Sequence, residues 1–203
     1  MNPVAWKSDR FLLGLTGMPG AGKSTARKIL ESMGCIGIDA DALAHLALQQ
    51  EDTMATLARI FGPEVISNGK PDRKRIAAIV FQDDTKLQKL NQIIHPIVRQ
   101  LAEERFQSMP AGSIGVYDVP LLFETGDTDI YDATLAVESS FETRLKRVAA
   151  RQWDRTELES RDRHHLPDKG QRATFAVSND GDVKDLEEKL RAVVESIRAG
   201  REQ

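Results

Sequence analysis

Gly17-Met18-Pro19-Gly20-Ala21-Gly22-Lys23-Ser24, followed by Thr25, fits the phosphate-loop pattern of glycine, four residues, glycine, lysine and serine or threonine. The apolar run 11–15 before it predicts a buried strand, and the residues from Ala26 onward predict a helix. The glycines let backbone N–H groups approach phosphate oxygens, and the helix start adds unpaired N–H groups. We therefore predict a nucleoside triphosphate site, with Lys23 on the β- and γ-phosphates and the Ser24 hydroxyl on Mg²⁺. The predicted binding residues are Gly20, Ala21, Gly22, Lys23, Ser24 and Thr25.

The composition of the chain narrows its class. Of the 203 residues, 40% are hydrophobic and 29% charged, as in soluble globular proteins. The net charge of −3 argues against a nucleic-acid partner. Because Cys35 is the single cysteine, an internal disulfide and a cysteine metal cluster are excluded, and a cytoplasmic location is expected. The sequence has no apolar run long enough for a membrane span, so we expect no membrane partner and a monomer or small homo-oligomer.

Strands and helices alternate along much of the sequence. Further short apolar runs predict strands at 35–38, 114–119, 133–137 and 175–177. The alternation predicts an α/β fold with a doubly wound parallel sheet covered on both sides. The predicted core comprises residues 10–51, 110–138 and 170–203.

Two helical segments interrupt this core. Residues 52–109 show helical spacing and no convincing strand, which predicts a helical insertion, and residues 139–169 predict a helical lid. We expect one helix to run from Leu43 to Phe61. A second helix should break at His95 and restart at Pro96, because proline disfavours the α conformation of the residue before it.

Asp39 and Asp41 follow the second predicted strand. If the backbone stays extended there, both carboxylates project to the same side, at the sheet edge where ligands bind. One could accept a proton from an attacking hydroxyl while the other holds substrate or Mg²⁺-bound water. The alternative is that one of them caps the helix that starts near Ala42.

Asp118, His95 and a row of arginines are the remaining candidates. Asp118 ends a predicted strand, where it could support the Mg²⁺ site or cap the segment after Pro120. Arg144, Arg147 and Arg151 are spaced to share one helical face, which suits triphosphate charge, although a charged face is often simply solvated. His95 is either a buried or capping histidine at the predicted break or a contact to a charged substrate.

Several motifs together resemble the dephospho-CoA kinase family. They are the phosphate loop, Asp39-Ala40-Asp41, Asp72-Arg73 with Val80-Phe81, Leu90-Asn91-Gln92-Ile93-Ile94-His95-Pro96-Ile97-Val98-Arg99, and Asp118-Val119-Pro120-Leu121-Leu122-Phe123-Glu124. The resemblance implies a P-loop NTPase-type kinase that uses ATP and Mg²⁺ to phosphorylate the ribose 3′-hydroxyl of dephospho-CoA. It also implies that residues 52–109 lie on the CoA side and that Asp41 is the catalytic base.

The expected roles follow from the motifs and the resemblance together. Asp41, Lys23 and Arg147 are expected to be catalytic, Arg144 and Arg151 to bind ATP, and Asp39, Arg73, His95, Asp118 and Leu121 to bind the acceptor. The chain departs from the family pattern at His45, His165, Thr174 and Ser178, in the lid, the adenine-side region and beside the substrate cleft. Another small-metabolite or nucleotide kinase, or a non-catalytic ATP-binding module, remains an alternative.

Overall fold

The computed structural model describes residues 9–80, 82–126 and 128–201. The chain forms two units, of which unit 1 comprises Met1–Ile38 and Ser108–Gln203 and unit 2 comprises Asp39–Gln107. Unit 2 thus begins earlier than the insertion predicted from residue 52, because the helix before that residue packs against other helices of unit 2. Phe81, part of one motif quoted above, lies outside the described residues.

Unit 1 is built on a five-stranded sheet with the strand order β2-β5-β1-β6-β7. Its elements are β1 (Phe11–Gly17), α1 (Lys23–Ser32), β2 (Ile36–Asp39), β5 (Ile114–Asp118), η3 (Thr128–Ile130), β6 (Ala133–Glu138), α6 (Phe141–Val148), η4 (Ala149–Arg151), α7 (Arg155–Asp162), α8 (Lys169–Arg172), β7 (Phe175–Ser178) and α9 (Val183–Arg201). β1 pairs in parallel with β5 and β6, and β6 with β7. The predicted α/β class with a parallel sheet is therefore confirmed.

The order of the strands places a ligand site at the end of β1. β5 lies on one side of β1 and β6 on the other, so the strand order reverses direction at β1. Open parallel sheets bind ligands at such a point, beyond the carboxyl ends of the strands. The register aligns Leu15 with Asp118 and Gly17 with Val137. The ends of β5 and β6 therefore flank the start of the phosphate loop, which we define as residues 17–24.

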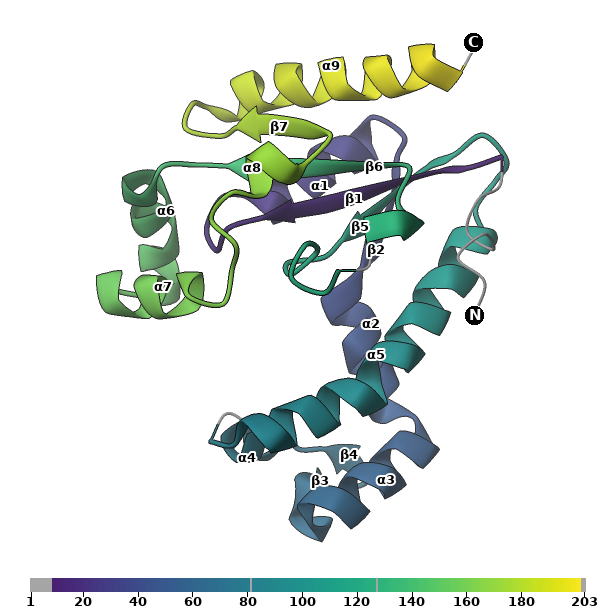
Figure 1. Ribbon diagram of the computed structural model, residues 1–203, viewed down its shortest axis with the longest axis vertical. Coiled ribbons are helices and arrows are strands. Elements are labelled where there is room, and N and C mark those ends of the chain that lie inside the picture. Colours follow the sequence, from purple (N-terminus) through teal and green to yellow (C-terminus); the bar gives the residue numbers. More distant parts are fainter. Residues whose placement is uncertain (1–8, 81, 127, 202–203) are drawn as a thin grey trace. The chain divides into compact units, whose positions relative to one another are not determined.

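The core of unit 1 lies between the sheet and two helices. Leu13 and Leu15 of β1 belong to one apolar cluster with Leu30 of α1 and Leu190 of α9, and Figure 1 shows both helices running along the sheet. The apolar spacing predicted for the closing helix is confirmed from Leu186 to Ile197. Val183, expected on the same face, is instead 60% exposed because it begins the helix.

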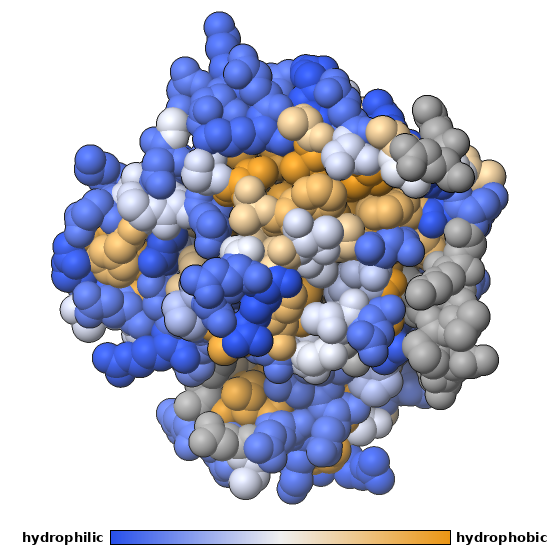
Figure 2. All heavy atoms as spheres, turned by 45° about the horizontal axis from the view of Figure 1, so that its top comes forward, coloured by the Kyte–Doolittle hydropathy of each residue, from blue (hydrophilic) through white to orange (hydrophobic). Residues whose placement is uncertain are grey.

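The visible surface is mainly hydrophilic, with a band of hydrophobic residues across the upper half of Figure 2. Among the described residues, every helix is too short or too polar to cross a membrane.

Unit 2 is mostly helical. Its elements are α2 (Ala40–Gln49), α3 (Glu51–Phe61), η2 (Pro63–Val65), β3 (Ile66–Ser67), β4 (Lys70–Pro71), α4 (Arg73–Val80) and α5 (Asp84–Gln107). It has its own apolar cluster, formed by Leu57, Phe61, Val65, Ile76 and Val80.

Three predictions for this region were wrong. The helix expected from Leu43 to Phe61 is interrupted at Gln50, where acidic residues of the next first turn favour a new helix start. Residues 52–109, predicted to contain no convincing strand, include a small hairpin of β3 and β4, because Asn68 and Gly69 both adopt positive φ. α5 runs through Pro96 without ending at His95, since the helix packs against α2, α3 and α4 and this packing outweighs the local preference.

Candidate active site

The phosphate loop is held in shape by its glycines and by contacts from unit 1. Gly20 and Gly22 have φ values of 79° and 99°, which favour glycine. A Cβ at Gly20 would lie 2.8 Å from Val148 Cγ1, and one at Gly22 would overlap the Asn179 amide. The loop therefore turns back on itself with backbone N–H groups at the start of α1, as an anion site requires.

Lys23 and Asp118 form an ion pair beside the loop. Asp118 is the last residue of β5 and is 6% exposed, and its Oδ1 accepts a hydrogen bond from Lys23 Nζ. Arg27 Nε lies 3.5 Å from the other carboxylate oxygen. The alternative that Asp118 caps a helix after Pro120 was wrong, because residues 120–124 form turns rather than a helix. Ser24, the predicted Mg²⁺ ligand, and Thr25 are exposed in the first turn of α1.

Arg144 joins residues 139–169, the segment predicted to be a lid and called the lid below, to the phosphate loop. Its guanidinium donates 2.8 and 2.7 Å hydrogen bonds to the two Asp162 carboxylate oxygens and a 3.0 Å bond to the Pro19 carbonyl. Arg144 is only 6% exposed and shares its buried face with Val148. Arg144 therefore does not belong to a simply solvated charged face, and Asp162 compensates its buried charge. Whether Arg144 binds ATP stays a prediction.

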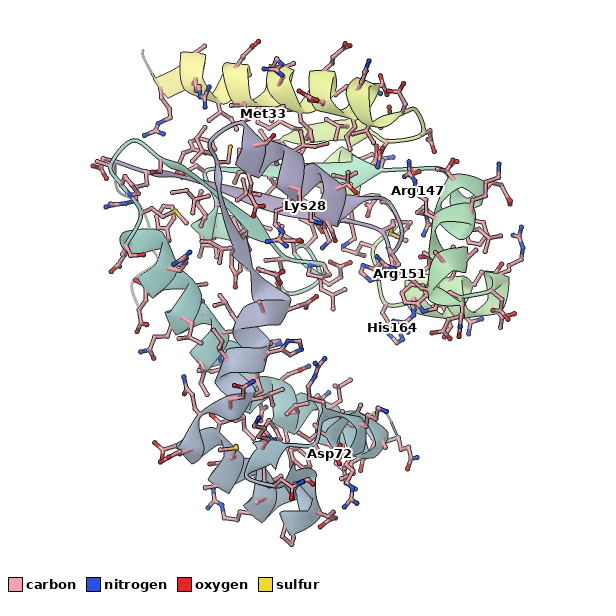
Figure 3. All side chains as sticks on the ribbon, turned by 180° about the vertical axis from the view of Figure 1, so that it is seen from behind. Lys28, Met33, Asp72, Arg147, Arg151 and His164 are labelled. Atoms are coloured by element: carbon pink, nitrogen blue, oxygen red, sulfur yellow. The ribbon has the colours of Figure 1, made fainter. Side chains whose placement is uncertain are left out.

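Arg147 contacts the loop from the same helix. Its guanidinium donates 3.3 Å hydrogen bonds to the Ala21 carbonyl and to Asn179 Oδ1. Asn179 is 5% exposed, and its amide donates a 2.7 Å bond to the same Ala21 carbonyl. Arg151 is exposed and lies over the Trp153 ring, and Figure 3 shows Arg147, Arg151 and His164 following one another along the lid.

The lid is less regular than predicted. Its first helix, α6, ends at Val148 and continues as the short η4, and Gln152 then adopts a φ of 61°. α7 follows with Asp154 as its N-cap. An open pocket of about 590 Å³ lies where the lid meets the end of β6. Its lining includes Met18, Glu138, Phe141, Arg144, Arg163 and Lys169.

A buried ionic cluster lies behind the turn that follows β5. Lys169 Nζ donates a 2.6 Å hydrogen bond to Glu124 Oε1, and His165 Nδ1 lies 3.8 Å from the same oxygen. Burial would raise the pKa of Glu124, but hydrogen bonds from Lys169 and the Leu166 amide hold it below its usual value. Burial, together with the charge of Lys169, lowers the pKa of His165, so this imidazole is neutral near pH 7.

The acidic pair and the other acceptor-side candidates lie in unit 2, except Asp118 and Leu121. Asp39 ends β2 and caps α2, accepting a 3.0 Å hydrogen bond from the Ala42 amide. The capping alternative is therefore confirmed, and the extended geometry expected for both carboxylates was wrong because Asp41 is already helical. Asp41, Arg73 and His95 are exposed on helices of unit 2. Leu121 is 37% exposed in the turn after β5 of unit 1.

The described residues contain no group of three or more histidine, cysteine, aspartate and glutamate side chains able to hold a metal ion. A Mg²⁺ ion at Ser24 would then take its other ligands from phosphate oxygens and water. This donor set fits Mg²⁺, which binds through few protein ligands and substrate phosphates.

Comparison with known proteins identifies the family. A family model described as Dephospho-CoA kinase matches residues 11–185. The chain belongs to the dephospho-CoA kinase family. The dephospho-CoA kinase of Leptospira interrogans is 39% identical over 194 residues, which cover 92% of this chain and 93% of that protein. The resemblance noted in the sequence is thereby confirmed, and the chain is a kinase.

Solved structures agree with this assignment. A Thermus thermophilus crystal structure superposes with a TM-score of 0.81 at 37% identity, over 92% of this chain and 97% of that chain. The dephospho-CoA kinase from Campylobacter jejuni has a TM-score of 0.63 at 22% identity, over 94% and 98% of the two chains, which shows a shared fold. Membership in this kinase family implies ATP as the phosphoryl donor.

Two departures from the family pattern have local partners in unit 1. The Thr174 hydroxyl accepts a 3.1 Å hydrogen bond from the amide of Thr134 in β6. The Thr174 amide donates a 3.0 Å hydrogen bond to the Thr134 hydroxyl. Ser178 Oγ accepts a 2.9 Å hydrogen bond from Lys189 of α9. His165 belongs to the buried cluster, and His45 is half-buried on α2.

The sequence pointed to the loop but missed three residues that support it. None of Asn179, Asp162 and Lys169 was among the predicted site residues. The Ser178-Asn179-Asp180-Gly181 stretch gave the one local signal, since asparagine after a strand end often bonds a backbone group. Asp162 and Lys169 gave none, because their partners are distant in the sequence.

Proposed function

We propose that this chain catalyses the ATP-dependent phosphorylation of the ribose 3′-hydroxyl of dephospho-CoA, which gives coenzyme A in the last step of its biosynthesis. The observation that carries the proposal is the family match over residues 11–185, in a chain whose phosphate loop has the required glycine geometry. The family match does not favour the alternatives, a different small-metabolite or nucleotide kinase or a non-catalytic ATP-binding module.

In the proposed reaction, ATP binds to residues 20–25. Backbone N–H groups of the loop and the start of α1 face the phosphate oxygens. Lys23 balances the charge on the β- and γ-phosphates, and Asp118 orients its ammonium through their ion pair. Mg²⁺ bound at the Ser24 hydroxyl would neutralise charge on the same phosphates.

Asp41 is the proposed base. Its carboxylate accepts the proton of the 3′-hydroxyl as the oxygen attacks the γ-phosphate, and an exposed position in the first turn of α2 leaves it accessible. Asp39, Arg73, His95, Asp118 and Leu121 are proposed to bind the acceptor. The exposure of Arg73 and His95 on helices of unit 2 is consistent with contact to an anionic substrate.

The lid supplies cations in this proposal. Arg147 is proposed to stabilise charge that develops during transfer, since it already contacts the loop at Ala21. Arg144 and Arg151 are proposed to bind the triphosphate. Closure over both substrates would exclude water, which protects ATP from hydrolysis. We further propose that the enzyme acts in the cytoplasm as a monomer or small homo-oligomer, without a nucleic-acid partner, consistent with its single, buried cysteine and acidic net charge.

A coupled assay of ADP release tests the reaction. Purified protein with ATP and Mg²⁺ should turn over dephospho-CoA and should show far lower rates with a nucleoside monophosphate or a small sugar. Turnover of one of those acceptors without turnover of dephospho-CoA would overturn the proposal.

The Asp41→Asn variant tests the base. We expect kcat to fall by at least about 10²-fold, because general base catalysis contributes roughly that much, while the Kd for ATP stays within about threefold. Asp52→Asn, an exposed aspartate in the first turn of α3, is the matched control and should keep its kcat. Equal rates for the two variants would remove Asp41 from the mechanism.

A further inference from the structure

Lys169 is a fully buried lysine beside the phosphate loop. It is 2% exposed, and its ammonium has three acceptors within hydrogen-bond reach. They are Glu124 Oε1 at 2.6 Å, the Pro120 carbonyl at 2.9 Å and Thr16 Oγ1 at 3.4 Å. Three N–H groups thus meet three oxygens, which is the full capacity of an ammonium.

The three acceptors lie on two different structural elements of unit 1. Thr16 is the residue of β1 that precedes the phosphate loop, and its hydroxyl also donates a 3.1 Å hydrogen bond to the Pro120 carbonyl. Pro120 follows two residues after Asp118, the partner of Lys23. Lys169 therefore donates hydrogen bonds both to the residue that precedes the phosphate loop and to the turn that follows β5.

A third element, the C-terminal end of the lid, is fixed at the same point. Glu124 Oε1 also accepts a 2.8 Å hydrogen bond from the Leu166 amide, three residues before Lys169 begins α8. Burial lowers the pKa of Lys169, whereas the hydrogen bond and charge of Glu124 raise it. The cluster thus connects the C-terminal end of the lid, the turn that follows β5, and Thr16, which precedes the phosphate loop.

Stability alone does not account for a lysine at this position. The desolvation cost of a buried ion pair can exceed the attraction between its charges, so an apolar pair of similar size would stabilise the fold as well. What an apolar pair cannot supply is directed hydrogen bonding to Pro120 and Thr16. This requirement points to geometry rather than stability.

We propose that Lys169 is a positioning residue for phosphoryl transfer, which sets the alignment of Asp118 and Lys23 by tying Thr16, Pro120 and Glu124 together. The proposal rests on the function proposed above for Lys23. Lys169 itself touches neither substrate nor reacting atoms in this assignment. It acts through the backbone of residues 118–120, and a small misplacement there is enough to slow transfer.

The test uses the Lys169→Met single variant, the Glu124→Gln single variant and the double variant that carries both. Lys169→Met leaves the Glu124 carboxylate buried without its cation, so it can lose stability or fail to fold. The double variant removes that charge, while the side-chain amide oxygen introduced by Glu124→Gln still accepts the Leu166 amide bond. Leu190→Ala, in the core between α9 and the sheet, is the control for loss of stability without loss of alignment. Melting temperature, kcat, the Kd for ATP and the KM for dephospho-CoA are measured for each variant, well below the lowest melting temperature.

We expect the double variant to regain most of the melting temperature lost in Lys169→Met and to keep a kcat about 10- to 100-fold below that of Glu124→Gln. The Kd for ATP should stay within about threefold of the unmodified protein. A double variant whose kcat equals that of Glu124→Gln would overturn the proposal, because Lys169 would then only neutralise Glu124. A fall in kcat no larger than that of Leu190→Ala would overturn it too.

Lys23→Met in the same assay separates this proposal from the proposed function. If Lys23→Met keeps the full rate, the assignment of the phosphate loop falls. If Lys23→Met is inactive and the Lys169 double variant is fully active, only the positioning role falls.

Discussion

The phosphate loop and the lid that contacts it hold their shapes by different means. The loop depends on backbone conformation, since Gly20 and Gly22 adopt positive φ and leave no room for a Cβ. The lid depends on ion pairs between side chains, above all the bidentate contact of Arg144 with Asp162. Steric substitutions should therefore damage the loop and its chemistry, whereas charge substitutions should damage the stability of the lid.

A second contrast lies within the lid, between buried and exposed pairs. The side chains of Arg144 and Asp162 are 7% and 19% exposed, but those of Arg155 and Glu142 are 54% and 66% exposed. An exposed pair contributes about 0–1 kcal/mol, while breaking a buried pair leaves an uncompensated charge in a poorly solvated site. Only the first pair, then, should control how the lid packs on the loop.

Gly22→Ala is expected to have the largest effect. Its Cβ would enter the space of the Asn179 amide at a φ of 99°, so the loop must shift, and kcat/KM should fall by about 10²-fold or more. Gly112→Ala is the matched control, because Gly112 also has a positive φ of 77° but its Cβ would meet no atom within 4 Å. The control should lose about 1 kcal/mol of stability and keep its kcat. Near-normal kcat/KM in Gly22→Ala would break the contrast between loop and lid.

Arg144→Met should have the next largest effect, on stability. The change leaves the partly buried Asp162 carboxylate unpaired and frees the Pro19 carbonyl, so the free energy of unfolding should fall by about 3 kcal/mol. Arg155→Met removes an exposed arginine from the same segment and should cost less than about 1 kcal/mol. Urea unfolding of both variants measures the difference. Losses of equal size would show that burial does not distinguish the two pairs.

His165→Gln should have the smallest effect, visible as a change in pH dependence. The pKa of His165 is lowered in the folded chain, so the unfolded chain binds a proton first as pH falls below about 6.5. The free energy of unfolding should therefore decrease with falling pH between about 6.5 and the lowered pKa, by at most about 1.4 kcal/mol per pH unit. Thermal melts between pH 5 and 8 should show this decrease in the unmodified protein and a flatter profile in the variant. Parallel profiles would mean that His165 does not titrate in this window.

Much of the fold was predictable because its signals are local. The apolar runs of β1, β5 and β6 and the spacing of α9 follow from the period of strands and helices. Where local signals and packing conflicted, packing prevailed, as in α5, which continues through Pro96. The asparagine and glycine at 68–69 carry a local hairpin signal, although residues 52–109 were predicted to contain no convincing strand.

The candidate site was predictable in part. The loop residues and Arg147 were found by pattern, and the structure connects them through Ala21. The partners of Asp118 were not found, since a carboxylate at a strand end is compatible with a metal site, a helix cap or an ion pair. Nothing local distinguishes these, because the choice depends on which side chains the neighbouring strand and helix bring to that edge.

The sequence by itself determined the phosphate loop and, through its motifs, the family. A glycine pattern between a strand and a helix restricts backbone conformation within a few residues, and this requires no knowledge of distant contacts. The tertiary structure alone decided that Asp118 pairs with Lys23, Arg144 with Asp162 and Lys169 with Glu124. Any charged side chain can pair with many others, and the partner is set only when the sheet and the lid bring two of them together away from water.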